Sequence, residues 1–222
     1  ENNVKQAEAR NLKVEEREVM RKLKMLIVAG ACVVAGGAFA AGGALAQGLA
    51  EPAMEVLPLG SVRPNEWLVE QLQKQASGLT GHAEELYDDI GKSDWLTGAN
   101  VGKEYAWERG PYYAKGLVAL ALVLDDASLK AKAQKWVDAI LGSQRADGDF
   151  GPKARNWWAN MIALWLLRDW CEATCDVRVV PFLERYFAFQ RAAFADYPLA
   201  AESKWAAARA GDELDVVLWL YR

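Results

Sequence analysis

The sequence is poor in the side chains that usually bind metals. It has one histidine, His82, and three cysteines, Cys32, Cys171 and Cys175. One histidine cannot build a multi-histidine metal site. Cys171 and Cys175 are four residues apart on one face of a predicted helix, which suits a disulfide poorly and supplies half a metal site. We interpret both as small core residues and His82 as a surface helix residue, so we expect no metal or cofactor within this chain.

An excess of basic residues is also missing. The chain has 26 Lys and Arg against 30 Asp and Glu, a formal net charge of −4, and it shows no basic stripe. This balance argues against a nucleic-acid partner. Hydrophobic residues make up 52% of the chain, which is enough for a sizeable core and argues against global disorder.

Charge is absent from one long stretch, residues 26–46. Arg21, Lys22 and Lys24 precede it, and an Ala-x-Ala site ends it at Ala46. A basic start, an apolar stretch and small residues at the end predict a signal peptide over 20–46, and hence a secreted or periplasmic protein with no stable membrane association after cleavage. A signal anchor is the alternative. The charged segment 1–19 is either sequence upstream of the true start or a short cytoplasmic helix.

Tryptophan recurs at nearly even spacing after a linker over 47–62. Trp107, Trp157 and Trp205 are 50 and then 48 residues apart, and each precedes a helical pattern. A period near fifty with helical content predicts an array of helix pairs. The pairs are expected at 111–124 with 129–141 and at 161–170 with 179–187, and a third begins near Asp212. No strand is expected.

These patterns predict an all-α fold over 63–222, the front part of a larger toroid of helix pairs. In such a ring, the loops that lead into the first helix of each pair gather at one end. Helix starts there offer free N–H groups to a polar ligand. The rim that carries Trp107, Trp157 and Trp205 is therefore the expected site for a glycan.

Several short motifs occur in a specific order from about residue 59 onward. They are Gly60-Ser61-Val62-Arg63-Pro64, Gly78-Leu79-Thr80-Gly81, Trp107-Glu108-Arg109-Gly110-Pro111-Tyr112-Tyr113, Ala133-Gln134-Lys135-Trp136, Ser143-Gln144-Arg145-Ala146-Asp147-Gly148 and Phe150-Gly151-Pro152. Together they resemble glycoside hydrolase family 127, the β-L-arabinofuranosidase-like enzymes, and its wider relatives.

The resemblance implies that this truncated toroid is the N-terminal part of a six-hairpin (α/α)6 toroid, and it implies hydrolysis of plant-type glycans, with arabinofuranosides favoured. It also implies a zinc-bound cysteine nucleophile and a glutamate acid in the full-length enzyme, at motifs expected beyond Arg222. Cys171 and Cys175 do not match those motifs. Two alternatives stay open: another carbohydrate-active enzyme on this toroid, such as a polysaccharide lyase or unsaturated uronyl hydrolase, or a non-catalytic helical-repeat module that binds glycan or protein.

Ten residues form the predicted substrate-binding set, because tryptophans beside polar residues at helix starts suit a sugar. Each has a structural alternative: helix capping or an ion pair for the charged residues and core packing for the indoles. Asp147 and Asp149 flank Gly148 in a predicted turn, where aspartate is common for backbone reasons. The ten residues are Asp94, Trp95, Trp107, Glu108, Arg109, Trp157, Trp158, Asn160, Arg209 and Asp212.

Overall fold

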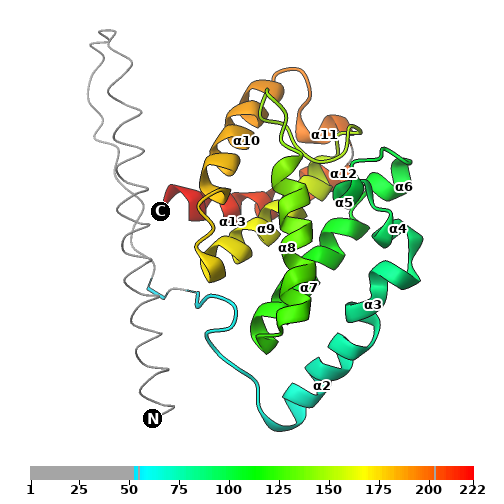
Figure 1. Ribbon diagram of the computed structural model, residues 1–222. Helices are drawn as coiled ribbons and strands as arrows, with labels where there is room; N and C mark the ends of the chain where they lie inside the picture. Colours follow the sequence, from blue (N-terminus) through cyan, green and yellow to red (C-terminus); the bar gives the residue numbers. More distant parts are fainter. Residues whose placement is uncertain (1–52, 55, 203) are drawn as a thin grey trace. The chain divides into compact units, whose positions relative to one another are not determined.

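The computed structural model describes residues 53–54, 56–202 and 204–222 (Figure 1). This part of the chain is helical and contains no strand, so the prediction of an all-α fold is confirmed for it. The predicted signal peptide and charged segment, with residues 47–52 and 55 of the linker, lie outside the described residues. None of the described helices is both long and apolar enough to cross a membrane.

Twelve helices follow one another through the described residues. They are α2 (Glu66–Ser77), α3 (Leu79–Leu86), α4 (Asp88–Gly91), α5 (Asp94–Thr97), α6 (Lys103–Ala106), α7 (Arg109–Leu124), α8 (Ala127–Gly142), α9 (Trp157–Thr174), α10 (Val179–Ala193), α11 (Leu199–Glu202), α12 (Lys204–Ala208) and α13 (Ala210–Tyr221). The polar stretch 88–102 includes the short helices α4 and α5, and α11 precedes α12, the short helix that contains Trp205.

The first hairpin joins α7 to α8 through a two-residue turn. Asp125 ends α7 in the left-handed conformation, with φ 58°. Asp126 then caps α8, because its carboxylate accepts a hydrogen bond from the backbone N–H of Leu129 at 2.8 Å. The apolar faces that this turn brings together are buried, Leu117 and Ala121 on one helix and Val137 on the other. The predicted hairpin is confirmed.

The second hairpin repeats this plan one period later. Asn156 caps α9 by accepting from the N–H of Ala159 at 3.1 Å. Cys175 ends α9 with φ 58°, fifty residues after Asp125, which has the same conformation. A left-handed residue at a helix end satisfies the last carbonyl groups and turns the chain back. The repeat is thus visible in the backbone as well as in the sequence.

The helices α7, α9 and α13 run side by side in the same direction and form one layer. Glu108 accepts a hydrogen bond from the indole N–H of Trp158, and the Lys115 ammonium lies 5.2 Å from the ring centre of Trp165. In each of these pairs, the two residues are fifty positions apart in the sequence. Between α9 and α13, Arg168 pairs with Asp215 at a separation of 47 residues. When contacting residues of two helices stay the same number of residues apart along the chain, the helices run parallel and in a fixed register.

A second layer consists of α3, α8 and α10, with α8 between the other two (Figure 1). Trp136 of α8 donates its indole N–H to Glu84 of α3 at 2.9 Å. On the other side, Gln144 just after α8 donates to the carbonyl of Phe182 in α10 at 2.9 Å. The core lies between the two layers and includes the fully buried side chains of Trp136, Trp157 and Phe182.

Candidate functional site

Six side chains meet where the three parallel helices begin, and we call them the helix-start cluster. Glu108 immediately precedes α7, Trp158 is the second residue of α9, and Arg209 immediately precedes α13. The contacts among these three residues bring the starts of all three helices together. The cluster consists of Glu108, Tyr112, Trp158, Trp205, Arg209 and Asp212.

Glu108 and Trp158 anchor the cluster. The Glu108 carboxylate accepts a hydrogen bond from the Trp158 indole, and the Tyr112 ring packs edge-on against Trp158 with centroids 6.1 Å apart. Burial raises the pKa of Tyr112, and the carboxylates of Glu108 and Asp212 raise it further, whereas the Arg209 guanidinium lowers it. The Tyr112 hydroxyl therefore stays protonated near neutral pH and can donate a hydrogen bond.

Arg209 connects the second and third helix starts. Its guanidinium lies 5.1 Å from the Trp158 ring centre and 5.4 Å from that of Trp205, which are cation–π distances. The nearest Asp212 oxygen is 3.9 Å from the guanidinium, too far for a hydrogen bond. This Asp212 Oδ2 atom is buried and has no hydrogen-bond partner among the described residues. The half-exposed Arg209 guanidinium thus keeps hydrogen-bonding capacity for a ligand, whereas the Asp212 Oδ2 atom is unsatisfied but buried.

Large aromatic side chains around the cluster face solvent. Trp205 is 60% exposed and Tyr112 44% exposed, and Trp107, next to Glu108, is 45% exposed. Trp158 is only 6% exposed, so it forms the buried base of the cluster. Exposed aromatic rings beside carboxylate, guanidinium and phenol groups offer both apolar faces and polar donors and acceptors. Of the three tryptophans of the predicted rim, Trp107 and Trp205 are exposed, whereas Trp157 is buried at the start of α9.

Three predicted residues are held by other partners. The Arg109 guanidinium forms an ion pair with the Asp89 carboxylate at 2.5 Å, and it lies 5.9 Å from the centre of the Tyr87 ring. Asp94 is buried and accepts a hydrogen bond from the backbone N–H of Val101 at 2.7 Å. Loop capping is therefore the role that the structure gives to Asp94.

Trp95 is the third of these residues. It is 2% exposed, and its indole N–H donates to the carbonyls of Ala106 and Trp107 at 2.8 and 3.1 Å. Its ring also packs edge-on against Phe150, with centroids 5.9 Å apart. Trp95 therefore fixes the segment that leads into Trp107 and offers no ring face to a ligand.

Trp157 and Asn160, also in the predicted set, lie in the core. Trp157 is fully buried and packs on Phe194 and Tyr197, while the Arg155 guanidinium lies 5.4 Å from its ring centre. Asn160 is 2% exposed. Both residues are on the side of α9 that faces the second layer, and burial removes them from the residues that a sugar can contact.

A buried polar seam lies beside Asn160, and the sequence did not reveal it. Gln190 donates to Glu213 at 2.6 Å and to the Tyr186 hydroxyl at 3.3 Å, and Asn160 lies beside Tyr186. Burial raises the pKa of Glu213 to about 7, and the Gln190 hydrogen bond opposes this rise. The buried seam consists of Asn160, Tyr186, Gln190 and Glu213. The one available signal was Glu213 itself, a charged residue one position after Asp212 in an apolar helix.

The remaining candidates have structural partners. Asp147 accepts from the N–H of Asp149 at 3.0 Å, and Asp149 is buried between Arg145, at 2.7 Å, and Arg155, at 3.2 Å. His82 lies 3.7 Å from Glu85 on the surface of α3. Among the residues described, no three His, Cys, Asp or Glu side chains gather as a metal site would require.

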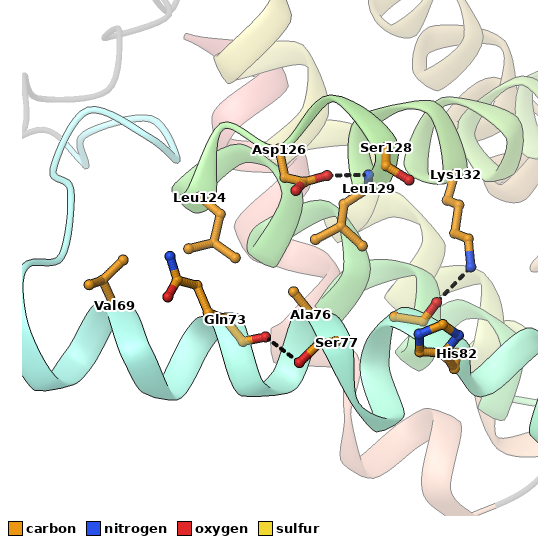
Figure 2. A pocket seen from close by; sticks show the side chains of 11 residues that line it. Val69, Gln73, Ala76, Ser77, His82, Leu124, Asp126, Ser128, Leu129 and Lys132 are labelled. Atoms are coloured by element: carbon orange, nitrogen blue, oxygen red, sulfur yellow. Dashed lines mark hydrogen bonds between the residues drawn. The ribbon is translucent and has the colours of Figure 1, made fainter.

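A cavity of about 440 Å³ lies at the other end of α7, away from the helix-start cluster. Figure 2 shows Val69, Gln73 and Ala76 of α2 on one side of it and Leu124 and Leu129 on the other. The Lys132 ammonium at its edge is already bonded, at 2.6 Å to the carbonyl of Gly81 and at 3.0 Å to Glu85. The cavity lacks exposed aromatic rings and free charged groups, so we place the candidate site at the cluster.

No protein-family model, no curated protein and no solved structure matches this chain, so the resemblance to glycoside hydrolase family 127 depends on its motifs alone.

Proposed function

We propose that this chain forms the glycan-binding part of a glycoside hydrolase and that the sugar binds at the helix-start cluster. The main support is the convergence of Glu108, Trp158 and Arg209 from three separate helix starts. Ligand sites commonly combine apolar surface with a few well-placed polar groups. Here the exposed rings of Trp205 and Tyr112 supply the apolar surface.

The proposal includes an (α/α)6 toroid. Three parallel helices with separations of 50 and 47 residues, covered by a second layer, correspond to half of such a ring. In a ring, the first layer lines the inside, and the starts of its helices form one rim. The cluster would then lie at the rim where a polysaccharide enters.

The chemistry of the cluster favours hydroxyl-rich ligands. The Tyr112 hydroxyl can donate a hydrogen bond, and the buried Asp212 Oδ2 atom, which has no hydrogen-bond partner among the described residues, can accept one. The Glu108 carboxylate accepts a hydrogen bond from the indole N–H of Trp158, which fixes its position in the cluster. Arabinofuranoside-like sugars, which the resemblance favours, present adjacent hydroxyl groups to such a set.

One observation favours the alternative of an enzyme for acidic sugars. Arg209 is half exposed and its closest carboxylate is 3.9 Å away, so its guanidinium could pair with a uronate. Against this, the cluster contains two carboxylates and one guanidinium, which repel an anion on balance. We therefore prefer the neutral sugar. Secretion, predicted from residues 20–46, stays a prediction.

Isothermal titration calorimetry with arabinotriose and a galacturonate trisaccharide tests the proposal. We expect the full chain to bind arabinotriose more tightly, and Glu108→Gln to weaken that binding about tenfold, because the indole bond to a charged acceptor is weakened. Glu104→Gln on nearby α6 is the matched control and should bind like the unaltered chain. Tighter binding of galacturonate would favour the lyase or uronyl hydrolase class. Absence of binding to either sugar would refute the glycan site.

A further inference from the structure

Two buried polar atoms lack hydrogen-bond partners, one on α13 within the helix-start cluster and one on α9 beyond it. The indole nitrogen of Trp165 and the Oδ2 atom of Asp212 are both buried, and neither has a hydrogen-bond partner among the described residues. A buried donor or acceptor without a partner is unfavourable, and native proteins usually satisfy it with water or a ligand. One atom donates and the other accepts, as a hydroxyl-rich ligand requires.

The register of the three helices brings these atoms to one level. Trp165 is fifty residues after Lys115, with which it is in contact, and Asp212 is 47 residues after Trp165. These are the same separations that join Glu108 to Trp158 and Arg168 to Asp215. Lys115, Trp165 and Asp212 therefore occupy matching positions on three neighbouring parallel helices.

Lys115 and Trp165 lie beyond the helix-start cluster, further along the same helices. Trp165 follows Trp158 by seven residues, which is two helical turns, on the same face and about 10 Å further along α9. Lys115 follows Tyr112 by three residues, also on one face. The displacement is longer than one sugar ring, so a single sugar at the cluster does not reach Trp165.

The side chains at this level are partly exposed, but the two atoms without hydrogen-bond partners are themselves buried. The Lys115 ammonium lies 5.2 Å from the Trp165 ring centre and covers that ring. Trp165 and Lys115 are half-buried, and the Asp212 side chain is 27% exposed. A sugar that follows the helix axis can therefore reach these side chains from the cluster, and it reaches the two buried atoms only if the side chains around them move.

We propose that Lys115, Trp165 and Asp212 form a second sugar-binding position, so that an oligosaccharide lies along α9. This inference rests on the proposed function, because it requires a sugar at the helix-start cluster. The ligand class is an oligosaccharide of at least two or three units, with hydroxyl groups that accept from Trp165 and donate to Asp212. Asp212 connects the two positions, since it belongs to both.

Calorimetry of the full chain with arabinose, arabinobiose and arabinotriose tests this. We expect affinity to rise about tenfold from one unit to three, and Trp165→Phe, which keeps a ring but removes the N–H, to weaken the trisaccharide about fivefold. The same variant should bind the monosaccharide normally. Trp67→Phe, at an exposed tryptophan of α2, is the matched control.

A second measurement avoids any loss of folding in the variant. In the unaltered chain, the indole N–H resonance of Trp165 should shift with arabinotriose and stay unchanged with arabinose. Equal affinity for all three sugars, with Trp165 unaffected, would show that water alone satisfies these atoms and would overturn the second position while leaving the first intact. Absence of binding to all three would instead refute the proposed function.

Discussion

Trp157 and Trp158 are neighbours in sequence but belong to two different regions of the molecule. Trp157 is fully buried among Phe194, Tyr197 and the Arg155 guanidinium, in the aromatic core between the two layers. Trp158 bonds to Glu108 and lies under Arg209, in the helix-start cluster. One residue of helix turns a side chain by about 100°. Aromatic and charged residues of the same types therefore stabilise the core on one side of α9 and build a candidate site on the other.

The largest effect should come from the core, at Gly151. This glycine has φ 77°, and a methyl group there would lie 2.6 Å from the Trp95 ring. Gly151→Ala combines backbone strain with overpacking and should lower the free energy of unfolding by about 3 kcal/mol. Urea unfolding measures this. Gly142→Ala is the control, since nothing lies within 4 Å of its added methyl group and it should be neutral or stabilising.

Glu213 tests the boundary between the two regions, because it is buried and directly follows Asp212. Its pKa in the folded chain is about 7, above the ordinary value of 4.5. The folded state thus holds a proton that the unfolded state releases, so stability is full below pH 4.5 and falls as pH rises to 7. Glu213→Gln removes this fall and should stabilise the chain by about 3 kcal/mol at pH 8, but hardly at pH 4.

Thermal unfolding at both pH values measures this difference. Glu184→Gln on the exposed side of α10 is the control and should shift the melting temperature equally little at pH 4 and pH 8. A Glu213→Gln variant that is equally stabilised at the two pH values, or is destabilised at pH 8, would contradict a protonated, buried Glu213.

Replacing the two neighbouring tryptophans should separate stability from binding. Trp158→Phe and Trp157→Phe should each cost about 2 kcal/mol, through a lost bond to a carboxylate in the first and a core cavity in the second. Only Trp158→Phe should weaken arabinotriose binding, because only Trp158 touches Glu108 and Arg209. If calorimetry showed that Trp157→Phe weakens binding as strongly, the division between core and cluster would be wrong.

The smallest effects should come from two exposed arginines. Arg209→Lys loses the planar group that covers Trp158 and Trp205, so sugar affinity should fall about threefold with a stability change near 0.5 kcal/mol. Arg109→Lys, which keeps an exposed pair with Asp89, should change both quantities less. Equal losses of affinity in the two variants would remove Arg209 from the binding surface.

The sequence predicts helices and repeats well where local chemistry decides them. Asp126 is a strong N-cap, and the turn at Asp125 recurs fifty residues later at Cys175. Glu108 was recognisable because it stands beside Trp107 just before a periodic apolar pattern. These signals depend on neighbours in sequence, so they can be read without tertiary structure.

The orientation of individual side chains could not be predicted in the same way. Nothing local distinguishes Trp157 from Trp158, since which face of α9 is covered depends on α10, a distant segment. Arg209 and Arg109 look alike in sequence, yet one meets two indoles and the other meets Asp89. The partner of Glu213 is Gln190, which is 23 residues away on another helix.

The central claim, a glycan site at the starts of α7, α9 and α13, is tested most directly by the ten indole N–H resonances of the full chain. They can be assigned with single Trp→Phe variants and followed while arabinotriose is added. We predict that Trp158 and Trp205 shift, while Trp136, bonded to Glu84 away from the cluster, and Trp67 on α2 stay unchanged. Shifts at Trp136 or Trp67 without shifts at Trp158 and Trp205 would contradict the claim.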